Sequence, residues 1–274
     1  IRLAGATPIE VGTVNGASED DIRHAISEKT AAIVFTISHH TTRYGCVSLK
    51  RVVEIACAHS LPVIVDGAAQ SFLIREIVAT GADLVICSGH KYLSGTTAGI
   101  VCGKADLIRA VALQNRGIGR PMKVGKEGIV GVMASLENRI KTDVNAWEAE
   151  QNRKMNIVID RFQDTPGVHL SVDPDPNGNP FSRAKVSIEP GEAGISSAAV
   201  CAAMAGGDPS ISLRCHHTDE GYFHVDTIEM SDEEVVLTCD RLERILKSSE
   251  AEKAQFVEVY ARSGSGDHRK VWLS

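Results

Sequence analysis

The amino-acid sequence predicts an α/β protein: a large domain built on a mostly parallel sheet, followed by a small α+β domain at the C-terminus. The first observation is an alternation through the first half of the chain, where short apolar runs are separated by amphipathic stretches with helical spacing. This alternation is typical of buried parallel strands joined by helices on both faces of the sheet. The second observation is that small and polar residues directly follow the apolar runs, as at the strand ends where α/β proteins bind ligands.

The elements of the large domain are marked by caps and by apolar spacing. Ser18 precedes acidic residues and then Ile22, Ala25 and Ile26, which share one helical face. The expected helices cover residues 18–30, 48–60, 71–80 and 105–114. Uninterrupted apolar runs rich in β-branched residues predict strands over residues 31–38, 61–66, 82–89 and 97–104.

The domain organisation follows from the change of pattern in the second half of the chain. We expect a large domain over residues 1–145 and a small C-terminal domain over residues 146–274, which includes a long linking helix within residues 126–163. Residues 165–180 are rich in turn formers. After them we expect strands over residues 183–190 and 222–230 and helices over residues 196–206 and 231–249. The first residues resemble the middle of a sheet, so we expect that the N-terminal part of the large domain is missing from this chain.

Composition narrows the class of protein and of partner. The 274 residues are 43% hydrophobic and 23% charged, as in ordinary soluble globular proteins. A net charge of −6 without a block of Lys and Arg disfavours nucleic acid, including tRNA, as a partner. No apolar run has the length of a membrane span, so no membrane partner is expected. Seven cysteines without a CxxC pair predict reduced thiols in a cytoplasmic protein.

No metal site is expected from the histidines. The pairs His39–His40 and His216–His217 are adjacent in sequence. Adjacent residues on a strand point to opposite faces of the sheet, so such a pair does not by itself form a metal site.

Two residues at the ends of neighbouring predicted strands indicate the chemistry. Asp66 ends the run "LPVIVD", and Lys91 lies just after the run "DLVICSG". Pyridoxal phosphate (PLP) enzymes need a lysine that holds the cofactor aldehyde and a carboxylate that keeps the pyridine nitrogen protonated. Small residues around Lys91, such as Gly89 and Gly95, leave room for a bulky cofactor near the backbone. The alternatives are a solvated surface lysine and an aspartate that caps the following helix.

Four further residues near these two are candidates for binding the cofactor. Ala68 is small enough to lie against the ring, and Gln70 can donate to the ring hydroxyl. Ser88 and His90 flank Gly89 and offer a hydroxyl and an imidazole to the cofactor phosphate. For Gln70 an exposed turn position remains an alternative, and for His90 a structural, partly buried histidine.

Two arginines are candidates for binding the substrate. Arg120 lies in the glycine-rich stretch "GIGRPMKVGKEG", where a fixed guanidinium can bind a carboxylate or phosphate. Arg214 follows a strand-like run in the small domain and is a candidate clamp for the substrate carboxylate. Ordinary surface charge is the alternative for both.

The segments "VDGAAQ" and "SGHKYLSGTTAGIVCGK" resemble those of fold-type I PLP enzymes, the aspartate-aminotransferase-like transferase fold. "SGHK" is similar to the class V aminotransferase and cysteine desulfurase branch. The wider pattern over residues 11–35, 48–66, 83–108 and 119–137 is more similar to the selenocysteine synthase branch, which includes L-seryl-tRNA selenium transferase and the D-glucosaminate-6-phosphate ammonia-lyase type. The segments 119–129 and 207–226 are most similar to the ammonia-lyase type.

The resemblance implies roles for these residues and an activity. It implies Lys91 as the Schiff-base lysine, Asp66 as the pyridinium partner, Ser88 and His90 near the phosphate, and Arg120 in the substrate pocket. The expected activity is a PLP-dependent lyase that eliminates water from a hydroxy-amino acid and releases ammonia to give a 2-keto acid. A sugar amino acid, phosphorylated or not, is the expected substrate, and a homodimer or larger homo-oligomer is expected.

Several alternatives remain open on the same residues. One is a selenium or sulfur transferase of the L-seryl-tRNA selenium transferase type, and another is a class V aminotransferase or cysteine desulfurase. A catalytically degenerate scaffold protein that keeps only the fold is an alternative of a different class.

Overall fold

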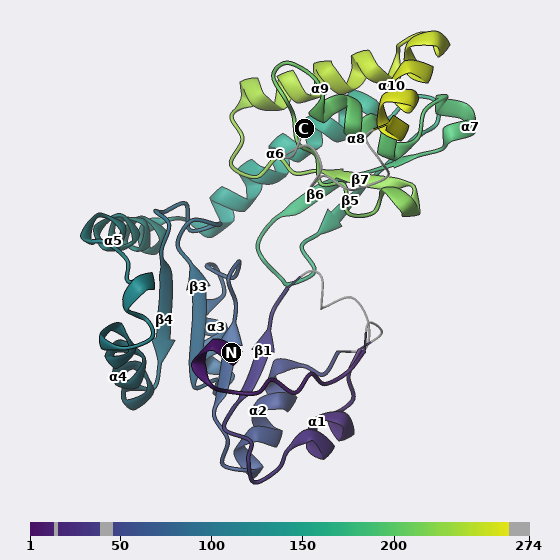
Figure 1. Cartoon of the computed structure of the whole chain (residues 1–274). Helices are drawn as coiled ribbons and strands as arrows, with labels where there is room; N and C mark the ends of the chain where they lie inside the picture. Colours follow the sequence, from purple (N-terminus) through teal and green to yellow (C-terminus); the bar gives the residue numbers. More distant parts are fainter. Residues whose placement is uncertain (14–15, 39–45, 263–274) are drawn as a thin grey trace. The chain divides into compact units, whose positions relative to one another are not determined.

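The computed structural model describes residues 1–13, 16–38 and 46–262, which form two compact units (Figure 1). The first unit consists of Ile1–Thr142 together with Pro176–Asn179. The second consists of Asp143–Asp175 and the residues from Pro180 onward. No helix in the described residues has both the length and the apolar character that a membrane span requires.

The first unit is built on a four-stranded sheet in the order β1-β2-β3-β4. Its strands are β1 (Ile33–Thr36), β2 (Val63–Asp66), β3 (Leu84–Ser88) and β4 (Gly99–Gly103). The first three are parallel, and β4 is antiparallel to β3. The sequence prediction of a mostly parallel sheet is therefore confirmed, with the antiparallel strand at one edge.

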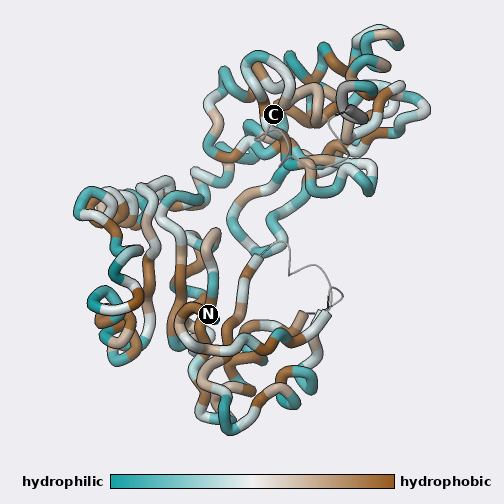
Figure 2. The backbone as a smooth tube through the Cα atoms, viewed as in Figure 1, coloured by the Kyte–Doolittle hydropathy of each residue, from teal (hydrophilic) through white to brown (hydrophobic). Residues whose placement is uncertain are grey.

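The helices of the first unit precede, separate and follow these strands. They are α1 (Glu19–Ala25), α2 (Leu49–Ala58), α3 (Ile74–Ala79), α4 (Ala105–Leu113) and α5 (Lys126–Lys141). Burial of apolar side chains holds this layer to the sheet, because α2 and α3 contribute Ala56 and Ile77 to the same cluster as Val63, Val65 and Val85. Hydrophobic stretches along β3 and β4 are brown in Figure 2.

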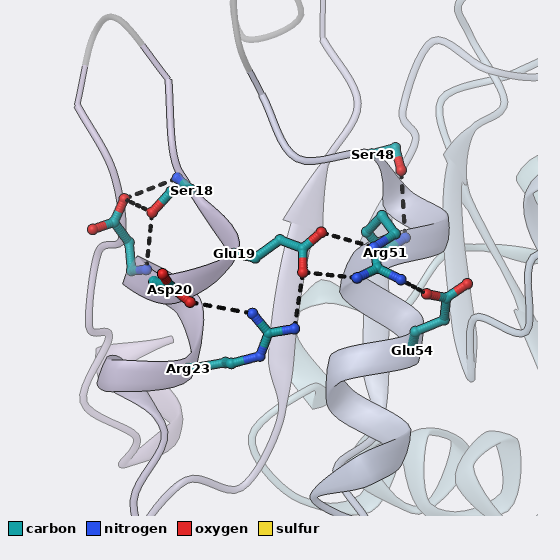
Figure 3. A network of polar contacts seen from close by, with 8 residues as sticks. Ser18, Glu19, Asp20, Arg23, Ser48, Arg51 and Glu54 are labelled. Atoms are coloured by element: carbon teal, nitrogen blue, oxygen red, sulfur yellow. Dashed lines mark hydrogen bonds and ion pairs between the residues drawn. The ribbon is translucent and has the colours of Figure 1, made fainter.

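The first two helices are joined by a network of ion pairs, shown in Figure 3. Ser18 caps α1 through a reciprocal capping box with Asp21, and Ser48 caps α2. Between the helices, Glu19 accepts from the Nε of Arg51 at 2.7 Å and from Arg23 at 2.8 Å. Arg51 also pairs with Glu54 on its own helix. This network fixes α1 against α2 on the exposed side of the unit.

The N-terminal residues differ from the expectation of a strand. Arg2–Ala4 form a short 3-10 helix, and residues 5–11 lie in no strand. Leu3 is 94% exposed and Ile9 is 68% exposed. The apolar residues of this segment therefore have no partner strand within the described part of the chain.

The second unit packs helices on a three-stranded antiparallel sheet in the order β5-β6-β7. Its strands are β5 (Val168–Pro174), β6 (Ser182–Ile188) and β7 (Tyr222–Val225). Its helices are α6 (Val144–Phe162), α7 (Pro190–Ala193), α8 (Ser197–Ala205), α9 (Asp232–Leu246) and α10 (Glu250–Arg262). The buried cluster between them includes Phe162, Val186, Met204, Phe223 and Leu242.

Two elements of this region differ from the sequence prediction. The expected long linking helix is two helices, α5 and α6, because Asp143 caps α6 through hydrogen bonds from the backbone of Asn145 and Ala146. The turn-rich stretch contains the strand β5. Its apolar residues Val168 and Leu170 face the core, and proline and glycine are confined to its ends.

Candidate active site

Asp66 and the residues after it form a turn at the carboxyl end of β2. One oxygen of the Asp66 carboxylate accepts a hydrogen bond from the backbone N–H of Ala68 at 3.2 Å. The N–H of Gly67 donates to the carbonyl of Ile86 at 2.9 Å, and the N–H of Ser88 donates to the carbonyl of Ala68 at 3.0 Å. The turn after β2 is therefore bonded directly to the end of β3, where the second motif begins.

Lys91 lies in a closed loop between β3 and β4. The N–H of Gly89 donates to the carbonyl of Ala98 at 2.8 Å, and the N–H of Gly95 donates to the carbonyl of Gly89 at 2.7 Å. Ser94 adopts a left-handed conformation with φ of 56° and donates to the carbonyl of Lys91 at 2.7 Å. The Lys91 side chain is exposed. Lys91 is therefore exposed to solvent on a loop whose backbone is fixed by hydrogen bonds within the loop.

The small residues of this loop are needed for its packing on α5. A Cβ atom on Gly89 would lie 2.7 Å from Cγ2 of Val132, and one on Gly95 would lie 2.8 Å from Oγ of Ser135. A Cβ on Gly99 would meet nothing within 4 Å. From the sequence, these small residues were predicted to leave room for the cofactor. For Gly89 and Gly95 the structure gives a different reason, which is close contact with a helix.

Arg139 of α5 connects the two motifs, a role that was not predicted from the sequence. Its guanidinium lies 3.6 Å from the ring centroid of Phe72 and donates a hydrogen bond to the carbonyl of Tyr92. One side chain therefore contacts both the segment after Gln70 and the loop that carries Lys91. An arginine in the last turns of an amphipathic helix gives no sequence signal for such a role.

Gln70 is the most unusual polar side chain near the site. It is fully buried, and within the described residues neither its amide nitrogen nor its amide oxygen has a hydrogen-bond partner. The expected alternative, an exposed turn residue, is therefore wrong. Leaving a buried polar group unsatisfied costs about 1–3 kcal/mol, so such a group usually has a partner. The unsatisfied amide of Gln70 fits a polar ring cofactor, which would supply the missing hydrogen bonds.

Cys87 lies beneath the site as a neutral thiol. Its sulfur is 3.7 Å from the carbonyl oxygen of Ala68. Burial raises the pKa of Cys87 to about 11, because the low dielectric disfavours the thiolate. A thiol in this state is a poor nucleophile and serves the packing of β3.

The remaining candidates are less closely connected to this pair of motifs. Ser88 is half-buried at the end of β3, and His90 is exposed in the Lys91 loop. Arg120 is exposed in a short 3-10 helix, Arg120–Met122. Within the described residues no hydrogen bond or ion pair joins Arg120 to the Asp66 turn or to the Lys91 loop.

Arg214 belongs to the second unit, where it contacts β7. Its backbone exchanges hydrogen bonds of 3.1 Å with His224, and its side chain pairs with Asp226 at 3.2 Å. Asp226 also accepts from Arg183 at 2.9 Å, and Arg183 pairs with Asp175 at 3.0 Å. The guanidinium is thus held in a fixed position by a shared carboxylate.

His39 and His40 lie outside the described residues. Among the residues described, no three His, Cys, Asp or Glu side chains gather in a way that would hold a metal ion.

Comparison with known proteins agrees with this architecture. A family model described as SelA, L-seryl-tRNA selenium transferase, matches residues 1–159. The chain is 36% identical over 247 residues to a 5'-C-glycyluridine monooxygenase-decarboxylase from Streptomyces sp, covering 90% of this chain and 62% of that protein. It is 35% identical over 245 residues to the D-glucosaminate-6-phosphate ammonia lyase of Salmonella typhimurium, covering 89% and 65%.

A solved structure of D-glucosaminate-6-phosphate ammonia-lyase superposes with a TM-score of 0.73 at 34% identity, covering 90% of this chain and 65% of that one. The chain thus has the fold of PLP-dependent enzymes of fold type I. Within that class it belongs to the SelA family. It spans less than two thirds of the length of the relatives named above.

Proposed function

We propose that the protein is a PLP-dependent lyase of the ammonia-lyase type. The observation that supports this most is the hydrogen bond between Ser88 and Ala68, which joins the Asp66 turn to the strand that leads into the Lys91 loop. An aspartate and a lysine at the same end of neighbouring parallel strands are the two groups that PLP chemistry requires. The similarity to an ammonia lyase over 89% of the chain supports the reaction class.

Asp66 and Lys91 perform the central steps in this proposal. Bound pyridoxal phosphate supplies an electron sink that stabilises negative charge at the substrate α-carbon. The Asp66 carboxylate keeps the proton on the ring nitrogen. The Lys91 amine would hold the cofactor aldehyde and would also be the base that accepts the proton from the substrate α-carbon. The closed loop around Lys91 keeps this amine in place for both roles.

The neighbouring residues hold the cofactor in this proposal. Ala68 lies at the turn after Asp66 and offers a small surface to the ring. The buried amide of Gln70 binds the ring hydroxyl, which would satisfy a group that now has no partner. Ser88 and His90 bind the phosphate with a hydroxyl and an imidazole at the end of β3.

The proposed substrate is a hydroxy-amino acid, and a sugar amino acid with a phosphate is the member that the ammonia-lyase relative suggests. In the net reaction the bonds from the α-carbon to hydrogen and nitrogen and the bond from the β-carbon to oxygen break. The β-hydroxyl leaves as water, a proton adds to the β-carbon, and a water oxygen replaces the nitrogen at the α-carbon, so the products are a 2-keto acid and ammonia. Arg120 and Arg214 bind the anionic groups of the substrate, with Arg214 held by Asp226 at 3.2 Å.

A second candidate reaction is oxidative decarboxylation of an amino acid. The relative named as a monooxygenase-decarboxylase is as similar to this chain as the ammonia lyase, at 36% against 35% identity. The two reactions can be distinguished, because the lyase reaction consumes no oxygen and releases no carbon dioxide.

We further propose that the protein is a homo-oligomer, a dimer or larger. Helix α5 exposes Ile129, Met133 and Ile140, which are 44%, 55% and 74% exposed. Their spacing places all three on one face of the helix. An exposed apolar stripe of this kind on a water-facing helix marks a contact surface.

The test compares the full-length protein with a Lys91→Ala variant and with the exposed-lysine control Lys50→Ala. With added pyridoxal phosphate, the wild type and the control should gain the visible absorbance band of lysine-bound cofactor, and Lys91→Ala should not. With D-glucosaminate-6-phosphate, ammonia release should fall by about 100-fold or more in Lys91→Ala, the scale of a lost general base. A band that persists in Lys91→Ala would exclude this lysine. Carbon dioxide release with oxygen uptake would favour the second reaction.

A further inference from the structure

The loop that carries Lys91 packs against one face of α5. The hydroxyl of Thr96 in this loop donates a hydrogen bond to the carbonyl of Gly128 at 2.8 Å. Near the other end of α5, Arg139 donates a hydrogen bond to the carbonyl of Tyr92 in the same loop. The helix residues that approach the loop are three or four positions apart and therefore share one face of the helix. They are Gly128, Val132, Ser135 and Arg139.

Arg139 also contacts a second segment, the one between β2 and α3. Its guanidinium carbon lies 3.6 Å from the centroid of the Phe72 ring. Phe72 lies two residues after Gln70, and Tyr92 directly follows Lys91. The guanidinium therefore lies between the segment that carries Gln70 and the loop that carries Lys91.

An arginine can make both contacts at the same time. A guanidinium is planar, so its face can lie on an aromatic ring while the N–H groups at its edge donate to a carbonyl. Arg139 is half-buried, and hydrogen bonds away from water are stronger than exposed ones. A lysine would keep the charge without the plane, and a methionine would keep neither the charge nor the donor.

We propose that Arg139 is a positioning residue that holds the Lys91 loop in register with the segment of Gln70. In the proposed function, Gln70 binds the ring hydroxyl of pyridoxal phosphate and Lys91 binds the aldehyde. These two groups are on neighbouring carbons of the ring, so a shift of one segment by about 1 Å would misplace the amine. The effect on the cofactor rests on the proposed function. The restraint on the loop does not, because Arg139 makes both contacts without the cofactor.

The first experiment measures hydrogen exchange in the full-length, cofactor-free protein by mass spectrometry. Arg139→Met should speed exchange about tenfold in peptides that cover residues 89–98 and 68–73, because both segments lose a contact with a charged group. Exchange in peptides from β2 and β3 should keep the wild-type rate. Arg139→Lys should lie between the wild type and Arg139→Met, because it restores the charge but not the plane.

A double-mutant cycle tests whether the two segments are coupled through Arg139. Phe72→Leu removes the ring under the guanidinium and should speed exchange in residues 89–98 about threefold, the scale of a lost cation–π contact. Phe72 itself lies outside this loop. When Arg139→Met is already present, Phe72→Leu should therefore add nothing to exchange in the loop. Additive effects of the two substitutions would contradict coupling through this side chain.

The second experiment titrates the same variants with pyridoxal phosphate. Arg139→Met should need about tenfold more cofactor than the wild type to reach half of the visible absorbance band, and Arg139→Lys should recover part of the loss. Lys141→Met is the matched control, since Lys141 is an exposed cation at the end of the same helix. It should behave as the wild type in both experiments.

The outcomes separate this proposal from the proposed function. Wild-type exchange in both segments of Arg139→Met would overturn the positioning role, and so would an equal rise throughout the first unit, which would indicate a general loss of stability. A wild type without the absorbance band would contradict the proposed function and leave the exchange result as the test of Arg139. If Arg139→Met does not fold, exchange in Arg139→Lys and Phe72→Leu decides.

Discussion

Among the single residues, Gln70 is one whose presence is explained by ligand binding and not by the stability of the fold. A buried side chain normally has its polar atoms bonded, since an unsatisfied group weakens the folded state. Gln70 is fully buried, and neither of its amide atoms has a hydrogen-bond partner among the residues that the structure describes. Stability alone would favour an apolar residue of the same size at this position. A glutamine at this position is therefore better explained by hydrogen bonds to a bound cofactor than by packing of the core.

Replacement of Gln70 by methionine should change stability and cofactor binding in opposite directions. The cofactor-free protein should gain about 1 kcal/mol in free energy of unfolding, because a buried unsatisfied amide is removed at similar volume. Affinity for pyridoxal phosphate should fall about tenfold, the equivalent of one hydrogen bond. Urea unfolding and a spectroscopic titration measure the two effects.

Ser71→Ala is the matched control for this change. Its hydroxyl is also buried and has no hydrogen-bond partner in the described part of the chain, but Ser71 has no proposed role in cofactor binding. We expect it to leave cofactor affinity unchanged. A Gln70→Met variant that loses stability and binds the cofactor normally would contradict the proposed role of Gln70.

At the scale of elements, the Lys91 loop depends on contact with α5. Gly89→Ala should lower the free energy of unfolding by about 1–3 kcal/mol, because the new methyl group would overlap Val132 and the carbonyl of Thr96. The same substitution should reduce ammonia release by displacing Lys91. Gly99→Ala, which meets nothing within 4 Å, should change stability by less than about 0.5 kcal/mol. Equal effects of the two variants would show that the loop does not pack on α5 in this way.

The boundary between α5 and α6 depends on one capping side chain. Asp143→Ala should lower the free energy of unfolding by about 1 kcal/mol, because two backbone N–H groups lose their acceptor. Asp143→Asn should change it little, since asparagine caps as well as aspartate does. Chemical denaturation measures both. A null result for Asp143→Ala would mean that the break between the two helices has another cause.

The α1–α2 network in Figure 3 makes stability depend on pH. Hydrogen bonds from Arg51 and Arg23 lower the pKa of Glu19 from 4.5 to about 2. A carboxylate with a lowered pKa stabilises the folded state above its ordinary pKa, and this stabilisation is lost as the pH falls toward the folded value. Glu19→Gln should therefore be less stable than the wild type above pH 4.5, and the difference should vanish as the pH approaches 2. Glu28→Gln, with no ion pair in the described residues, should show no such trend.

At the scale of the whole molecule, the sequence predicted best what depends on local pattern. The strands that end at Asp66 and Ser88 were predicted because buried parallel strands are continuous apolar runs. Strand β5 was missed because prolines and glycines around it dominated the interpretation, although Val168, Leu170 and Val172 alternate with polar residues. Long-range contacts leave no such pattern, and so the contact of Arg139 with both motifs and the isolation of the Gln70 amide required the structure.

The assembly of the molecule is tested by placing a charge on the exposed stripe of α5. Met133→Glu should lower the mass of the full-length protein measured by light scattering, because a carboxylate at the centre of an apolar contact loses its hydration without gaining a partner. Val172→Glu is the matched control, since Val172 is 51% exposed, close to the 55% of Met133, and lies on β5 of the other unit. The control should keep the wild-type mass. An unchanged mass for Met133→Glu would show that subunits meet through another surface or not at all, and a loss of mass in both variants would indicate a general effect of added charge.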